Sequence, residues 1–271
     1  MKKNIILLMT AVFGVFVLAG CSEDDLNKTS AVLDSPTVEN DFDRWLAKNY
    51  MEPYNIDFKY RFKDVLGDMD YNLTPADYGQ AIKLAKLTLH LTLQVYDEVT
   101  GSRQFISENF PKIVHVIGSP AYNENNNIVL GVAEGGKMMT LYQVNIIDYL
   151  LNTKDIDQLN ELFFKTMHHE FGHILHQTRP YSTDFNAVTP SSYVGDACFD
   201  TYRTDAAARQ AGFITRYSSK APDEDFVEQL SLYVTSTAAE WEAILAQGGS
   251  AGRPLLEQKN DIMRAYMLST W

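Results

Sequence analysis

The segment Lys165 to Gln177 reads Lys-Thr-Met-His-His-Glu-Phe-Gly-His-Ile-Leu-His-Gln and contains the pattern His-Glu-x-x-His. At about 100° of rotation per residue, His169 and His173 lie one turn apart on the same face of a helix, so both imidazoles can reach one metal ion. Glu170 lies about 100° away from His169, beside the metal, where a carboxylate can accept a proton from water. The segment therefore predicts a helix that carries a hydrolytic metal site.

The same helix has an apolar face, which we expect to pack on the core while the histidines face a cleft. Its residues follow each other at intervals of three or four: Leu159, Phe163, Met167, Phe171 and Ile174. The alternative is a helix whose two histidines are simply hydrogen-bonded, since the pattern occurs by chance in roughly one chain in a hundred of this length. A ligand in a second segment favours metal binding over that alternative.

A hydrolytic zinc site generally has three protein ligands and one open position for water, so the two histidines need a third ligand. Glu224 is the candidate, 51 residues after His173 (224 minus 173), in the first turn of a helix that Pro222 is predicted to open. Glu228, one turn further on, is placed to hydrogen-bond a ligand histidine and is also an alternative ligand. Acidic residues at a helix N-terminus also complement the helix dipole, which would explain Glu224 without a metal.

His176 is another alternative ligand, because it lies three residues after His173 on the same face. One continuous helix would hold His169 and His176 about 10.5 Å apart along its axis, too far for both to bind one ion easily. We therefore expect His176 to line the cleft or to support a ligand. The other histidines are expected to be structural or exposed: His90, His115 and His168.

The first 20 residues predict a signal peptide, because two lysines precede an apolar run from Ile5 to Leu18 that is too short to span a bilayer comfortably. Leu18-Ala19-Gly20-Cys21 resembles a bacterial lipobox, in which the cysteine becomes the lipidated N-terminus; the alternative is an ordinary signal peptide with a coincidental cysteine. The run Ser22-Glu23-Asp24-Asp25 resembles the acidic signal that sends some Gram-negative lipoproteins to the outer face of the outer membrane, although a solvated acidic tether has the same composition. We expect an outer-membrane lipoprotein exposed at the cell surface, with a periplasm-facing location as the alternative.

Residues 21 to 40 are predicted to form a flexible acidic tether, and residues 41 to 271 a single domain with enough apolar residues for a sizeable core. Removal of the leader changes the formal charge from −12 to −14, because it deletes two lysines and no acidic residue. This charge argues against nucleic acid as a partner. With Cys21 lipidated, Cys198 is the only other cysteine, which argues against a structural zinc site, usually rich in cysteine. The sequence does not determine the oligomeric state.

Alternating or continuous apolar runs predict short strands at residues 56–62, 112–117, 127–132 and 138–144, with a turn at Glu134 to Lys137. Helices are expected near residues 42–46, from the N-cap Thr74 with Pro75 in the first position through Val95, and from Asp155 through the histidine pattern. Leu87 to Val95 also alternates like a strand, but the helix is favoured because no turn signal interrupts it. Further helices are expected at residues 222–234, 238–246 and, after a Gly-rich break at 248–252, up to Leu268; residues 178–195 are predicted to form a surface loop.

The motif His169-Glu170-Phe171-Gly172-His173, followed by Glu224-Asp225-Phe226-Val227-Glu228, resembles the gluzincin metallopeptidases. Within them it resembles the catalytic domain of anthrax lethal factor, over about residues 165 to 235. From about residue 35 to residue 271 the chain, with its lipobox, Pro53-Tyr54-Asn55-Ile56 and Ala133 to Lys137, is similar to the putative zinc-binding metallopeptidase lipoproteins of anaerobic Gram-negative bacteria. The resemblance implies an α+β, zincin-like fold with a small twisted mixed sheet, an active-site helix and a helical C-terminal half.

The resemblance also implies one Zn²⁺ per chain, a peptide or protein substrate, and a role for Tyr217, seven residues before Glu224, in stabilising the tetrahedral intermediate. Alternatively, Tyr217 only packs under the helix that Pro222 opens. Zincins commonly bind substrate along an edge strand, for which residues 138–144 are the candidate. The sequence thus predicts a zinc metallopeptidase. The alternative is a non-catalytic surface protein that binds peptides or glycans, which the presence of the base Glu170 argues against.

Overall fold

Four short strands form a mixed sheet in the order β1-β2-β6-β5. These strands are β1 (Asp57–Lys59), β2 (Ile113–Val116), β5 (Gly131–Glu134) and β6 (Met138–Leu141). The first three in spatial order are parallel, whereas β5 runs antiparallel to β6. A separate antiparallel pair is formed by β3 (Ala121–Tyr122) and β4 (Ile128–Val129). The small mixed sheet expected from the sequence is confirmed.

The computed structural model describes residues 39–67, 70–122, 128–134 and 136–271. The predicted leader, Cys21 and nearly all of the predicted tether lie outside the described residues. The segment Asn40–Trp271 forms one compact unit. Within the described part of the chain, no helix combines the length and the apolar character needed to cross a membrane.

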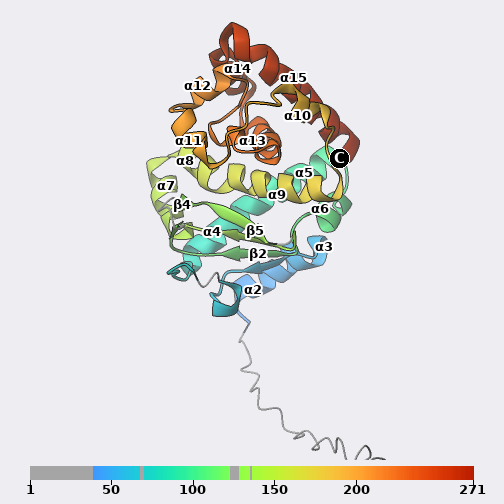
Figure 1. Ribbon diagram of the computed structural model, residues 1–271. Helices are drawn as coiled ribbons and strands as arrows, with labels where there is room; N and C mark the ends of the chain where they lie inside the picture. The colour runs from blue at the N-terminus through green and yellow to red at the C-terminus, as the bar shows by residue number, and fades with distance from the viewer. Residues whose placement is uncertain (1–38, 68–69, 123–127, 135) are drawn as a thin grey trace, which may run out of the picture. The chain divides into compact units, whose positions relative to one another are not determined.

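A continuous helical segment carries the histidine pattern and consists of α8 (Ile156–Leu159), the π-helical turn η5 (Asn160–Lys165) and α9 (Thr166–Thr178). Asp155 caps its start by accepting a hydrogen bond from the backbone N–H of Gln158, at the position the sequence predicts. All five residues of the predicted apolar stripe are buried. Figure 1 shows α9 between the sheet and α13 (Pro222–Thr235), so its opposite faces contact different layers.

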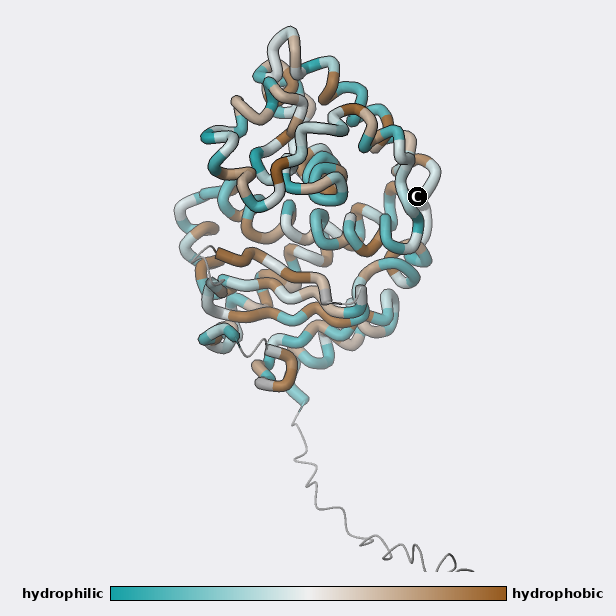
Figure 2. Tube along the Cα trace, viewed as in Figure 1, coloured by the Kyte–Doolittle hydropathy of each residue, from teal (hydrophilic) through white to brown (hydrophobic). Residues whose placement is uncertain are grey.

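Helices make up most of the remaining structure. Before α8 the elements are α2 (Asp41–Leu46), η1 (Ala47–Met51), α3 (Glu52–Tyr54), η2 (Asp64–Leu66), α4 (Tyr78–Thr88), η3 (Leu89–Leu93), α5 (Gln94–Thr100), α6 (Gln104–Asn109), η4 (Val144–Ile146) and α7 (Ile147–Thr153). After α9 they are α10 (Asp184–Val188), η6 (Gly195–Ala197), α11 (Cys198–Thr201), α12 (Asp205–Gln210), η7 (Tyr217–Ser219), α13, α14 (Ala238–Gln247) and α15 (Gly249–Thr270). Figure 2 shows hydrophobic stretches along the sheet strands, in line with the burial of β2 and β6. The α+β class with a helical C-terminal half is confirmed.

The predicted helix start at Thr74-Pro75 is wrong. Helix α4 begins at Tyr78, and Asp77 caps it by accepting a hydrogen bond from the backbone N–H of Gln80. The carbonyl of Thr74 instead accepts a hydrogen bond from the backbone N–H of Gly118. Pairing with a distant segment therefore outweighs the local capping signal, which is a weak determinant by comparison.

The predicted edge strand is also wrong, because β6 lies inside the sheet between β2 and β5. The edge strand next to the histidine helix is β5, which packs against α9. Gly131 permits this close approach, since a Cβ atom there would lie only 2.6 Å from Cγ2 of Thr166 in α9. Periodicity finds strands but does not give their order in the sheet, and this is where the prediction failed.

Two further boundaries differ from expectation. The segment 178–195 contains a short helix, α10, whose Phe185 is fully buried. The Gly-rich stretch separates α14 from α15 as predicted, but the break is confined to Gly248: α15 begins at Gly249 and continues through the rest of the stretch. Helix α15 packs against α12 and α14 there, so tertiary contacts outweigh the low helix propensity of glycine.

Candidate metal centre

The centre lies where α9 packs along α13. Gly172, within the histidine pattern, faces Val227 of α13: a Cβ atom at residue 172 would lie 3.0 Å from Cγ1 of Val227. That distance is shorter than the usual contact of about 3.5 to 4.0 Å between carbon atoms. A side chain at residue 172 would therefore crowd Val227, and glycine lets the two helices lie this close without a shift. Their approach brings the histidines of α9 to the first turn of α13.

Three candidate ligand atoms converge at this junction. Oε2 of Glu224 lies 3.3 Å from Nε2 of His169 and 3.2 Å from Nε2 of His173. Among the described residues, these three side chains are the group of His, Cys, Asp or Glu that could hold a metal ion, with their ligand atoms within 4.8 Å of one another. The structure thus brings together the three residues predicted from the sequence.

The two nitrogen–oxygen separations are compatible with a zinc ion. Zinc binds His nitrogen and carboxylate oxygen at about 2.0 to 2.2 Å, so neighbouring ligand atoms of a tetrahedral site are about 3.4 Å apart. The observed nitrogen–oxygen separations of 3.2 and 3.3 Å are close to that value. Two imidazoles and one carboxylate are also a donor set found in catalytic zinc sites, which leave one position open.

The other ring nitrogen of each histidine has a separate partner. Nδ1 of His169 lies 2.9 Å from Oε1 of Glu228. Nδ1 of His173 lies 3.1 Å from Nε2 of His176. Glu228 and His176 therefore contact the ligand histidines, as expected from the sequence. These contacts orient both rings with Nε2 toward Glu224.

Glu228 belongs to a buried network that sequence analysis only partly anticipates. Its Oε2 accepts a hydrogen bond of 2.7 Å from the hydroxyl of Thr215 and lies 3.5 Å from Nζ of Lys165. Lys165 also contacts Glu161, at 2.9 Å. Lys165 is one helical turn before His169, a spacing that could have identified it, whereas nothing in the sequence marks Thr215.

The network determines the charges of its members. Burial favours the uncharged form of Glu228, but Lys165 and the hydrogen bond with His169 outweigh burial and lower its pKa to about 2. Burial likewise disfavours a charged His169, yet the carboxylates of Glu224 and Glu228 raise its pKa to about 10. The pKa of Glu224 is depressed well below its usual range, because the two histidines outweigh its burial. The site is thus built to hold positive charge between its carboxylates.

Tyr217 lies next to the candidate ligands. Its hydroxyl donates a hydrogen bond of 3.1 Å to Oε1 of Glu224, the oxygen not shared with the histidines. Burial and the nearby charge of Glu224 raise the pKa of the phenol, so Tyr217 remains a hydrogen-bond donor at neutral pH. Nζ of Lys220 in turn donates to the Tyr217 oxygen at 3.3 Å.

A cleft of about 650 Å³ is lined by His169, one of the three candidate ligands. Glu170 lines it together with His169 and Tyr217, and it does not belong to the group of candidate ligands. The cleft also borders Leu130 and Gly131, at the start of the edge strand β5. A carboxylate that is not a ligand, a tyrosine hydroxyl and a strand edge therefore share one cavity with the candidate metal centre.

The first turn of α13, which carries Glu224, is fixed from its other side. Asp225 is fully buried, and its Oδ2 lies 2.5 Å from Nζ of the fully buried Lys259 in α15. The same carboxylate oxygen accepts a hydrogen bond of 2.9 Å from the hydroxyl of Tyr193. Because loss of one partner would leave a buried charge uncompensated, the pair keeps α13 and α15 in a fixed relation.

The three other histidines lie apart from the centre. His168 is buried, which lowers its pKa to about 4, and its Nδ1 lies 2.9 Å from the hydroxyl of Tyr96. His115 is buried in β2, and His90 is exposed beside Gln94.

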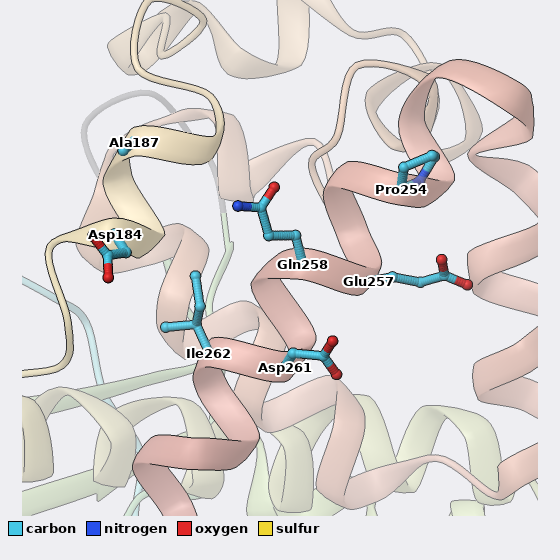
Figure 3. A pocket seen from close by; sticks show the side chains of 7 residues that line it. All are labelled: Asp184, Ala187, Pro254, Glu257, Gln258, Asp261 and Ile262. Atoms are coloured by element: carbon cyan, nitrogen blue, oxygen red, sulfur yellow. The ribbon is translucent and has the colours of Figure 1, made fainter.

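A second hollow, of about 600 Å³, lies between α10 and α15 (Figure 3). Its lining is acidic and contains no histidine or cysteine: Asp184, Ala187, Pro254, Glu257, Gln258, Asp261 and Ile262. Carboxylates on a solvent-exposed surface are common without any ligand, so this hollow does not compete with the histidine cleft as a catalytic site.

Comparison with known proteins adds two findings. A family model described as "Putative zinc-binding metallo-peptidase" matches residues 35–271. A crystal structure of a putative zinc-binding metallo-peptidase from Bacteroides caccae is similar to this chain, with 36% sequence identity, 85% of each chain covered and a TM-score of 0.72. None of the curated proteins matches the chain.

Substitutions at the two glutamates of α13 should distinguish the metal ligand, Glu224, from Glu228, which only hydrogen-bonds a ligand histidine. Glu224→Gln, like His169→Ala or His173→Ala, should abolish stoichiometric zinc binding. Glu228→Gln should raise the zinc Kd by about 10- to 100-fold, because it removes the charge that accepts the hydrogen bond from His169. Chelator competition and metal analysis measure both effects, with exposed Glu98→Gln in α5 as the control. The third ligand is misassigned if Glu224→Gln holds one zinc at wild-type affinity while Glu228→Gln or His176→Ala does not.

Proposed function

Because the chain belongs to the putative zinc-binding metallo-peptidase family, we propose that it hydrolyses peptide bonds of peptide or protein substrates, with one zinc ion per chain. The observation that carries the proposal is the convergence of His169, His173 and Glu224 beside a cleft that also contains Glu170. A binding protein would need the ligands but no general base. The second carboxylate therefore favours catalysis over binding alone.

His169, His173 and Glu224 would hold the zinc ion, with Glu228 and His176 orienting the two rings. When bound, zinc lowers the pKa of a water ligand and polarises the carbonyl group of the substrate. If Nε2 of each histidine holds the metal, Nδ1 of each ring would carry the ring proton. Nδ1–H of His169 would then donate a hydrogen bond to Glu228, and Nδ1–H of His173 would donate one to Nε2 of His176.

Glu170 acts as the general base and acid in this proposal. Its carboxylate accepts a proton from the attacking water as the oxygen–carbon bond forms. It then donates that proton to the nitrogen of the leaving amine as the carbon–nitrogen bond breaks. The two transfers return Glu170 to its ionised state at the end of each turnover. Its position next to His169 keeps it at the cleft without making it a ligand.

Tyr217 supplies a hydrogen-bond donor for the oxyanion that develops on the substrate carbonyl oxygen. Its phenol stays protonated, and it lies beside the ligand Glu224, within reach of the same cleft. The peptide backbone would lie along β5, which is paired with β6 on one side and with no other strand of the described residues. An extended substrate can pair with the free edge of such a strand.

Glu170→Gln provides the direct test of this function. The substitution keeps the size of the side chain but removes its basicity, so zinc content should equal that of the wild type while peptide hydrolysis falls by about 10² to 10⁴-fold. A peptide-library digest followed by mass spectrometry measures the activity, and metal analysis of the same samples measures zinc. Exposed Glu98→Gln should cleave like the wild type. Absence of hydrolysis by the zinc-loaded wild type would contradict the proposal and favour a binding protein.

Tyr217→Phe should lower kcat by about 10² to 10³-fold and leave KM and zinc content nearly unchanged. The reason is that the lost donor acts on charge that exists only in the transition state. If Tyr217 instead only packs under α13, the melting temperature should fall while kcat stays close to that of the wild type. Measuring kcat, zinc content and melting temperature on this one variant distinguishes the two roles.

We also propose that Cys21 carries lipid and anchors the protein to the outer membrane, with the domain exposed at the cell surface. The support is the lipobox-like run Leu18 to Cys21 after a basic, apolar leader, followed by acidic residues. Several acyl chains anchor a protein far more durably than one. Cys21→Ser should therefore move the protein from the membrane fraction to the soluble fraction, measured by fractionation and immunoblotting. Retention of the variant in the membrane would rule out this anchor.

A further inference from the structure

Building on the proposed peptidase function, we propose that Arg216 and Phe199 form a subsite for a carboxylate group of the substrate, close to the scissile bond. The carboxylate can belong to an Asp or Glu side chain or to the C-terminus of a peptide. Both residues line the cleft that is also lined by Glu170 and by the candidate ligand His169.

Arg216 and Phe199 are stacked along the cleft. The central guanidinium carbon of Arg216 lies 5.1 Å from the centre of the Phe199 ring. The ring also lies nearly parallel to that of Tyr217, with 6.2 Å between the centres and 21° between the planes. Phe199 is 45% exposed, so its ring is accessible to a substrate in the cleft. Stacking on an aromatic face limits the motion of the guanidinium and prepares it for a ligand.

Asp205 contacts Arg216 at its backbone and at Nε. Its Oδ1 accepts a hydrogen bond of 2.9 Å from the backbone N–H of Arg216 and lies 3.5 Å from Nε of the same residue. The two terminal nitrogens of Arg216 form no hydrogen bond or ion pair with any other described residue. A guanidinium presents donors on more than one edge, and two parallel donors bind a carboxylate in a bidentate manner. Arg216 therefore keeps donors for a second carboxylate.

Arg216 differs in this respect from the two other cations of the cleft. Lys165 is already paired with Glu161 and Glu228. Lys220 contacts the Tyr217 oxygen and lies 3.9 Å from Glu224. Among the described residues that line the cleft, Arg216 is thus the cation with donors left for a substrate.

The position of Arg216 limits which substrate group it can reach. It directly precedes Tyr217, the proposed oxyanion donor, so a carboxylate bound to it lies near the residues that flank the scissile bond. The segment Ile128 to Leu130, which also lines the cleft, is apolar and offers no side chain that binds an anion. The geometry therefore predicts a preference for a carboxylate on the Arg216 side of the cleft.

Three pools of degenerate hexapeptides test this subsite. One pool is blocked at both ends and has Glu at one fixed position, the second has Gln there, and the third has Gln and a free C-terminal carboxylate. Wild-type protein should cleave the first or the third pool roughly tenfold faster than the second, since a hydrogen bond to a charged group contributes substantially to recognition. The first pool distinguishes a side-chain carboxylate, and the third a C-terminal one.

Arg216→Met should bring these rate ratios close to one. A merely structural defect would lower all rates together and leave the ratios unchanged. Arg203→Met is the matched control, because Arg203 is 81% exposed and should leave the ratios as in the wild type. Equal wild-type rates for all pools, or a preference that survives Arg216→Met, would overturn the subsite.

The same pools also separate this proposal from the proposed function. Binding of each pool to the zinc-loaded Glu170→Gln variant, with and without Arg216→Met, is measured without any need for turnover. If the wild type cleaves no pool but Glu170→Gln binds carboxylate pools more tightly and loses that preference with Arg216→Met, the peptidase function fails and the subsite stands. If cleavage occurs without any carboxylate preference, the subsite fails and the peptidase function stands.

Discussion

The close packing of α9 on α13 is the constraint on which the candidate metal centre depends. His169 and His173 come from one helix and Glu224 from the other, so their spacing is fixed only when the helices are fixed. Gly172 allows the approach toward Val227, and the buried pair of Asp225 and Lys259 ties the first turn of α13 to α15. A small displacement of α13 would therefore change the ligand spacing before it exposed any of the core.

Charge burial explains why the surroundings of the centre are so polar. Glu228 is almost fully buried, and an isolated carboxylate there would be costly. Lys165, Thr215 and His169 each contact it and together keep it ionised. The negative charge next to His169 then strengthens that ring as a metal ligand. Lys220 also contacts this region, because its ammonium group lies near both the phenol oxygen of Tyr217 and the carboxylate of Glu224, which are hydrogen-bonded to each other.

The sequence predicts most of the candidate centre and only part of the fold. His169, His173 and Glu170 follow from helical spacing, and Pro222 correctly marks the start of the helix that carries Glu224. The strand order could not be predicted, because short apolar runs do not specify their neighbours, and β5 rather than β6 forms the edge. Phe199 and Arg216 were missed for a similar reason. Neither belongs to a motif, and only the path of the chain between α11 and η7 brings them together.

X-ray diffraction at the zinc absorption edge, on crystals of the zinc-loaded protein, tests the metal centre most directly. We predict one anomalous peak per chain, bound by Nε2 of His169, Nε2 of His173 and a carboxylate oxygen of Glu224. A peak bound by His176 or Glu228 in place of one of these residues, or no peak at the junction of α9 and α13, would contradict the account.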